Sequence, residues 1–293
     1  LADLAPIEVT RPARPARIAR LPIDEPINAR LNRPLTLVSI TPLPERAEVG
    51  EQLSVVWYWR AARRPGADFS ARLVWLDSNG ATAARTPAVL PAAGYPTSVW
   101  KRGDVWRGLH LLYVPGSLEA GDYEVAVQLY DAAGEPAGDP AVIGEMAVST
   151  PPRSFDVPEM DVQAGAGWEN GILLLGYDLP NRRLRQGDGL SLMLYWQPRD
   201  EIATSLTVFV HLIDAENTIV AQRDQLPAAG SRPTAGWAPG EVIADGYGFL
   251  ISEEMPPGEY RLRVGWYDAR TGERVRLADG SDFWMLPQVL TVR

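Results

Sequence analysis

The stretch GEQLSVVWYW, residues 50–59, decides the fold class because it occurs twice. Its second copy, GDGLSLMLYW, lies at residues 187–196, an offset of 137. In both copies apolar side chains fall on every second position, which is the pattern of a β-strand with one face in a core. The repeat therefore predicts the same strand in two places along the chain.

Three more motifs recur in the same order around this strand. The motif LPAAG occurs at residues 90–94 and 226–230. The motif Pro-Thr-x-x-Trp-x-x-Gly-[Asp/Glu] occurs at 96–104 and 233–241. A Gly-x-Tyr motif that leads into Tyr-Asp occurs at 121–131 and 258–268. Four anchors in one order, with a single residue of slippage, indicate a tandem duplication.

Each copy has the features of an all-β domain. Turn sequences such as DSNG (77–80), DAAG (131–134) and DARTG (268–272) separate short alternating runs. The sequences EAGDY (119–123) and PPGEY (256–260) resemble the tyrosine corner of Greek-key sandwiches. We therefore predict an all-β protein of tandem duplicated immunoglobulin-like β-sandwiches with an extended Pro/Arg-rich N-terminal arm. The immunoglobulin cysteine pair is absent, so hydrophobic burial has to hold the sheets together.

The repeat also predicts the boundaries of the domains. The arm is expected at residues 1–33, the first sandwich at 34–150, a linker at 151–170 and the second sandwich at 171–293.

The arm offers a candidate interaction surface. Its arginines fall on every third residue, so that in a polyproline II helix they would line one edge; they are Arg11, Arg14, Arg17 and Arg20. A solvated linker is the alternative reading. We expect residues 18–30 to pack apolar side chains on a sandwich and to add a strand at an open edge. Two aromatic residues on nominal solvent faces, Tyr58 and Tyr195, are further candidates for contact between domains or subunits.

Composition argues against several classes of function. The chain has no Cys and only two His, His110 and His211, without the spacing of metal ligands. No nucleophile elbow, P-loop or dinucleotide motif occurs, so we expect no enzyme, no cofactor and no metal. A net charge of −9 argues against nucleic acid as a partner. No apolar run is long enough to span a bilayer, so any membrane association is expected through segments outside this chain.

The Pro-Thr-x-x-Trp loops are the best candidate for a ligand site. An exposed Trp beside a carboxylate suits a sugar, because the ring stacks on the pyranose and the carboxylate accepts hydroxyl hydrogen bonds. These residues are Trp100 with Asp104 and Trp237 with Glu241. The alternative, and the favoured reading, is that each Trp closes the end of its sandwich.

The second copy also carries a recognisable combination of motifs. VFVHLID (208–214) is followed by AQRD (221–224), the PTAGWAPGE loop (233–241) and GEY with GWYD (258–268). This combination resembles the extracytoplasmic C-terminal β-sandwich domains of bacterial polytopic membrane proteins of the dolichyl-phosphate-mannose mannosyltransferase type. The resemblance covers most of residues 171–280 and implies a location outside the membrane, beside a glycan-handling enzyme. It carries over no catalytic residue, and the first copy departs from it, with Val74 where the second copy has His211.

These observations favour a non-catalytic, extracytoplasmic structural or interaction module that pairs with other protein subunits or with itself. The alternatives are a carbohydrate-binding module that uses the loop tryptophans, an accessory domain of a membrane glycosyltransferase, and an unrecognised hydrolase.

Overall fold

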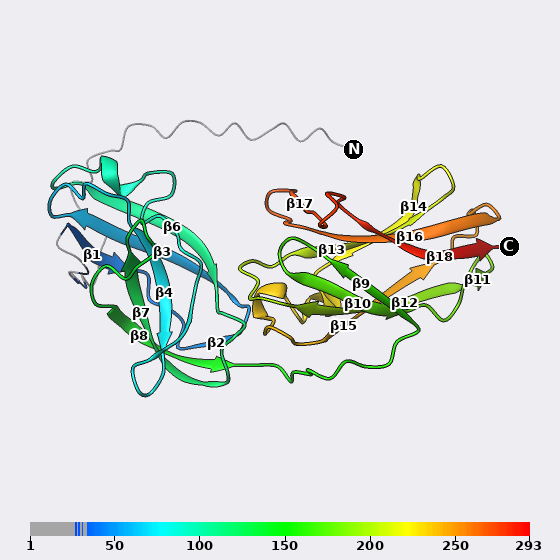
Figure 1. Cartoon of the computed structure of the whole chain (residues 1–293), viewed down its shortest axis with the longest axis horizontal. Coiled ribbons are helices and arrows are strands. Elements are labelled where there is room, and N and C mark those ends of the chain that lie inside the picture. Colours follow the sequence, from blue (N-terminus) through cyan, green and yellow to red (C-terminus); the bar gives the residue numbers. More distant parts are fainter. Residues whose placement is uncertain (1–26, 28, 30, 32–33) are drawn as a thin grey trace.

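The structure, a computed structural model, describes residues 27, 29, 31 and 34–293. In this part of the chain the regular elements are eighteen β-strands and three short 3₁₀ turns. They form two β-sandwiches that lie end to end and are joined by an extended linker (Figure 1). The all-β prediction with duplicated sandwiches is confirmed.

The first sandwich consists of a three-stranded sheet and a five-stranded sheet. The smaller sheet has the order β1-β3-β6, and the larger sheet has the order β2-β8-β7-β4-β5. Strands β2 and β8 pair in parallel and the other neighbours pair antiparallel. The strands are β1 (Leu35–Ile40), β2 (Arg46–Glu48), β3 (Gln52–Ala61), β4 (Ser70–Leu76), β5 (Thr82–Arg85), β6 (Val105–Tyr113), β7 (Gly121–Tyr130) and β8 (Ala141–Ser149).

The second sandwich repeats this arrangement. One sheet has the order β15-β12-β10-β9, and the other has the order β11-β18-β16-β13-β14, with β17 attached to β16. The strands are β9 (Val162–Gly167), β10 (Ile172–Asp178), β11 (Arg183–Leu184), β12 (Gly189–Pro198), β13 (Thr207–Ile213), β14 (Ile219–Gln225), β15 (Ile243–Leu250), β16 (Gly258–Tyr267), β17 (Arg274–Val275) and β18 (Trp284–Val292). The 3₁₀ turns are Thr97–Val99 in the first copy and Ala228–Gly230 and Thr234–Gly236 in the second.

Strands of the two copies correspond at the offset of 137 that the motifs gave. Strand β3 (Gln52–Ala61) matches β12 (Gly189–Pro198), and β7 (Gly121–Tyr130) matches β16 (Gly258–Tyr267), residue for residue. The parallel pair β2–β8 reappears as β11–β18.

The structure moves the end of the predicted arm and the end of the predicted linker. Ala29 pairs with Leu37 as Ala166 of β9 pairs with Leu174, again at an offset of 137. Ala29 therefore takes the place of Ala166 and belongs to the first sandwich, and β9 itself lies in the segment expected to be a linker. The sequence of β9, VQAGAG, lacks the regular alternation of large apolar residues that the inner strands have. Ile27 and Ala29 hydrogen-bond to the open edge of β1, so the expected edge pairing is confirmed for these two residues. Residues 1–26, 28, 30, 32 and 33, which include the four arginines, lie outside the described residues.

Tryptophans form the centre of each core. Trp57, Trp59 and Trp75 are fully buried in the first sandwich, and Trp196 and Trp266 are fully buried in the second. Trp196 and Trp266 meet edge to face with ring centroids 4.7 Å apart, a favourable geometry for aromatic pairs.

Both tyrosine corners are present. The Tyr123 hydroxyl donates to the Glu119 carbonyl at 3.1 Å, and the Tyr260 hydroxyl donates to the Pro256 carbonyl at 2.7 Å. No helix in the described part of the chain has the length and apolar character needed to cross a membrane.

Candidate functional site at the domain joint

The loops proposed for sugar binding do not expose their tryptophans. The side chains of Trp100 and Trp237 are both 0% exposed and pack into the cores of their sandwiches. A ring without exposed surface cannot stack on a pyranose, so the predicted sugar platform is wrong and the alternative, a plug at the end of each sandwich, holds.

The polar residues of these loops hold the backbone in place. In the first copy the Thr97 hydroxyl donates to the Ala67 carbonyl and accepts from the Phe69 amide. Thr234 makes the same pair of bonds to Thr204 and Leu206 in the second copy. Each threonine therefore clips the loop to the start of the adjacent strand.

The carboxylates of the loops are also occupied. Asp104 accepts from the Lys101 amide at 2.8 Å, and Glu241 accepts from the Ala238 amide at 3.0 Å. The Glu241 side chain is completely buried and forms an ion pair with Arg232. With both rings buried, neither Asp104 nor Glu241 stands beside an exposed tryptophan, which the sugar-platform prediction required.

The second-copy loop instead forms the joint between the two sandwiches. Gly50 of the first sandwich meets Gly236 so closely that a Cβ on Gly50 would lie 2.7 Å from the Gly236 Cα. A Cβ on Gly116 would overlap the carbonyl of Trp237. Backbone therefore lies directly on backbone, and only glycine fits at these three positions.

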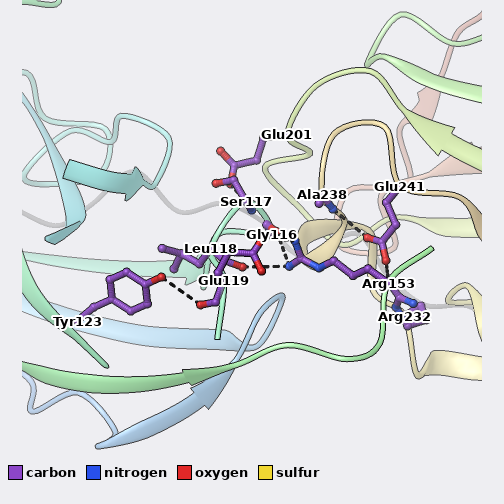
Figure 2. Close-up of polar contacts among 10 residues, drawn as sticks. All are labelled: Gly116, Ser117, Leu118, Glu119, Tyr123, Arg153, Glu201, Arg232, Ala238 and Glu241. Atoms are coloured by element: carbon purple, nitrogen blue, oxygen red, sulfur yellow. Dashed lines mark hydrogen bonds and ion pairs between the residues drawn. The ribbon is translucent and has the colours of Figure 1, made fainter. Parts of the chain in front are cut away.

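The linker locks this joint from the side, as Figure 2 shows. Arg153 donates to the carbonyls of Gly116 and Leu118, at 2.7 and 3.1 Å, and its side chain is only 8% exposed. Ser117 donates through its hydroxyl to Glu201 of the second sandwich at 3.1 Å. Since both bonds from Arg153 are charge-assisted, the linker contributes to the joint as well as tethering the domains.

The linker also binds the second sandwich directly. The Val242 amide donates to the Ser154 carbonyl at 2.7 Å, and Arg232 donates to the Pro152 carbonyl at 3.4 Å. Residues 152–154 thus contact both domains.

A cavity of about 190 Å³ opens beside the joint. Its polar wall includes Arg72 and Arg85 of the first sandwich and Glu201 of the second, and its floor is apolar. Arg72 is already engaged, because it donates to the Thr86 carbonyl and stacks over Tyr130.

The equivalent loop of the first copy does not support such a joint. Val99 stands where the second copy has Gly236, and its side chain is 55% exposed. Glu253 stands where the first copy has Gly116. The close contact of the joint can therefore be made once in the chain.

A buried carboxylate lies behind the joint loop. Asp245 is completely buried and accepts hydrogen bonds from the Tyr247 hydroxyl, the Trp196 indole and the Ala228 amide, at 2.7, 3.1 and 2.8 Å. Burial raises the pKa of Asp245 above its ordinary value, although the three donors oppose the shift. Ala228 and Ala229 have φ values of 50° and 53°, so this turn is strained in a region that alanine rarely adopts.

The first copy has no charged residue at this position. Gly108 stands in the place of Asp245 and packs against Trp57, the counterpart of Leu194, whose indole donates to the Pro91 carbonyl at 2.7 Å. Asp245 and its hydrogen bonds to Trp196 and Tyr247 therefore occur in one copy only, and their role is structural.

The other predicted site residues are separate from the joint. Tyr58 is half-buried on the outer face of β3, and the Tyr195 hydroxyl donates to Asp178 at 2.7 Å. His211 is buried, and its Nδ1 accepts from Arg263 at 3.3 Å. Among the described residues no group of three or more His, Asp or Glu side chains could hold a metal ion.

Sequence reasoning missed the residues that make the joint. Gly116 and Arg153 lie outside the repeated motifs and Gly236 fills a variable position in one of them, but the comparison of the two copies offered a signal. The other copy has Val99 in place of Gly236 and Glu253 in place of Gly116. The sandwich fold itself therefore does not require glycine at these two positions.

Comparison of the sequence with known protein families and with curated proteins finds no match. Among solved structures, the C-terminal domain of Wzt matches with a TM-score of 0.36 and 11% identity, over 46% of this chain and 87% of that chain. A Niemann-Pick type C2 protein from the Japanese carpenter ant matches with a TM-score of 0.29 and 8% identity, over 39% and 91% of the two chains. A CARDB domain from Pyrococcus furiosus, in complex with di-metal ions, matches with a TM-score of 0.28 and 11% identity, over 46% and 100%. Each likeness covers less than half of this chain.

Proposed function

We propose that the chain is a non-catalytic, extracytoplasmic structural module, which holds two sandwiches as one rigid unit and presents their outer faces to other protein subunits. Its place outside the cell is the one that the resemblance to membrane-protein sandwich domains implies. On the same ground it would serve as an accessory domain of a membrane glycosyltransferase.

The joint is the observation that supports this proposal. The second-copy loop that the sequence suggested as a ligand site instead holds one sandwich against the other. At this joint Gly50, Gly116 and Gly236 contact backbone directly. A flexible tether between binding domains needs no such fit, and interfaces between independent domains are usually small and polar. Rigid spacing is what a scaffold requires.

The joint can be tested by exchanging residues between the copies. Gly236→Val and Gly116→Glu introduce the residue that the other copy has at the same position, so each sandwich should still fold. We expect small-angle X-ray scattering to show a larger maximum dimension and a broader distance distribution for both variants. If the wild-type scattering curve can be fitted only with several domain arrangements, the proposal is contradicted.

Carbohydrate binding is the alternative function that the resemblance leaves open. It would use a surface other than the two tryptophan loops. A glycan array probed with the wild-type chain separates the two functions. The structural module predicts no specific glycan, and a specific signal that survives Gly236→Val would favour the sugar-binding alternative.

A further inference from the structure

Strand β6 of the first sandwich has an open edge, whereas the equivalent edge in the second sandwich is capped. Both β6 and its counterpart β15 are the last strands of their sheets. In β15 the carbonyls on the free side are capped, since Arg223 donates to Gly248 at 3.3 Å and Gln225 donates to Gly246 at 3.4 Å. These side chains come from β14 in the opposite sheet.

The first sandwich lacks the capping residues. Strand β5 ends at Arg85, because the Thr86 hydroxyl turns inward to accept from the Leu73 amide and Pro87 has no amide to donate. Among the described residues, no backbone amide or carbonyl of residues 105–113 in β6 hydrogen-bonds to a group outside β3. An uncapped edge is a template for another strand.

Strand β6 has apolar side chains at positions where β15 has glycine. Leu109 and Leu111 occupy the positions of Gly246 and Gly248, and they are 51% and 45% exposed. They lie beside Val56 and Ser54 on the outer face of the sheet. The sandwich thus combines an open edge with an exposed apolar row, which protein surfaces ordinarily avoid.

We propose that β6 pairs antiparallel with β6 of a second copy of the chain. By equivalence with Gly246 and Gly248, the carbonyls of Leu109 and Leu111 point to the free side, so the odd-numbered residues pair across the two-fold axis. With the axis at His110, Leu109 faces Leu111 of the other copy and Arg107 faces Tyr113. This register places apolar beside apolar and a guanidinium beside an aromatic ring.

Charge argues against the arm of the chain as the occupant of this edge. The charged residues on the outer face of β3 and β6 are Arg60 and Arg107, and no acidic residue lies on this face. The arm carries its own row of arginines at 11, 14, 17 and 20, which this face would repel. The inference deepens the proposed function, on which it rests for the choice of a protein partner.

Analytical ultracentrifugation of the full chain tests the pairing. We expect a reversible monomer–dimer equilibrium and a weakening of about tenfold or more, or roughly 1.4 kcal/mol, for Leu109→Lys. Leu250→Lys is the matched control, because Leu250 lies at the end of β15 and is 74% exposed; it should leave the equilibrium unchanged. A wild-type chain that stays monomeric, or an unchanged dimer for Leu109→Lys, overturns the proposal.

Cross-linking tests the register, since the chain has no native cysteine. A mixture of Leu109→Cys and Leu111→Cys chains should form disulfide-linked dimers under mild oxidation, several-fold more than either variant alone. Equal cross-linking by Leu109→Cys alone would overturn the register. Loss of the dimer on deletion of residues 1–26 would assign the contact to the arm.

The two proposals fail separately. Gly236→Val should loosen the joint without changing the monomer–dimer equilibrium. A monomeric wild type with a rigid joint would overturn only the pairing of β6, and a dimer with a loose joint would overturn only the rigid module.

Discussion

At the scale of single residues, the two copies show which side chains the fold needs. Trp59 and Trp196 are both 0% exposed and stand at equivalent positions. Truncation to Ala should cost about 3–5 kcal/mol in either copy, because a large cavity replaces a packed ring. Urea unfolding measures this cost, and a value near zero would place the rings outside the core.

The threonine clip gives a smaller and more specific prediction. Thr234→Val keeps the shape of the side chain but leaves the Leu206 amide and the Thr204 carbonyl without their partner. We expect a loss of about 1–3 kcal/mol in the free energy of unfolding. Thr218→Val in an exposed turn is the control, and an equal loss in both variants would contradict the role of the clip.

The buried carboxylate predicts a dependence of stability on pH. The pKa of Asp245 is raised by burial, so the folded state holds its proton at a pH where the unfolded state has released it. Stability from this group is therefore highest at acidic pH and falls as the pH rises from the ordinary aspartate pKa through the raised one. Asp245→Asn should lack this decline, and parallel stability curves for wild type and variant would contradict the assignment.

At the scale of elements, the tyrosine corners that open β7 and β16 are equivalent, but their hydrogen bonds differ in length. Tyr260 donates to its corner at 2.7 Å and Tyr123 at 3.1 Å. Tyr260→Phe should destabilise the chain by about 0.5–1.5 kcal/mol, and Tyr123→Phe by no more than that. Differential scanning calorimetry compares the two, and an unchanged midpoint for Tyr260→Phe would show that the corner contributes no stability.

The elements also show how far sequence reasoning reaches. Strands β3, β7, β12 and β16 were predicted, because their inner faces carry large apolar residues at a strict period of two. Strand β9 was missed, because VQAGAG offers no such pattern and its pairing depends on the neighbouring strand. Tertiary context decides short edge strands.

The candidate site was harder to predict than the strands. The motif Pro-Thr-x-x-Trp was found, but its repetition could not tell a buried ring from an exposed one. Exposure depends on which residues close over Trp100 and Trp237, and these come from distant parts of the chain.

At the scale of the whole molecule, the two copies differ at the residues that make their joint. Val99 and Glu253 stand at the positions where the existing joint has glycine. A side chain at either position would prevent a contact of the same geometry.

The linker arginine is part of the same unit. Arg153→Ala removes two hydrogen bonds to the carbonyls of Gly116 and Leu118. We expect faster independent tumbling of the sandwiches by NMR relaxation, with each sandwich still folded. Arg183→Ala, at an exposed arginine on β11, is the control and should leave tumbling unchanged.

The rigid joint is the central claim, and a distance distribution between the two sandwiches tests it most directly. Because the chain has no cysteine, spin labels at Asp139→Cys and Glu253→Cys place one probe on each exposed surface. We predict a single narrow distribution by double electron–electron resonance, which broadens when Gly236→Val is added. A broad distribution in the labelled protein without Gly236→Val would contradict the account.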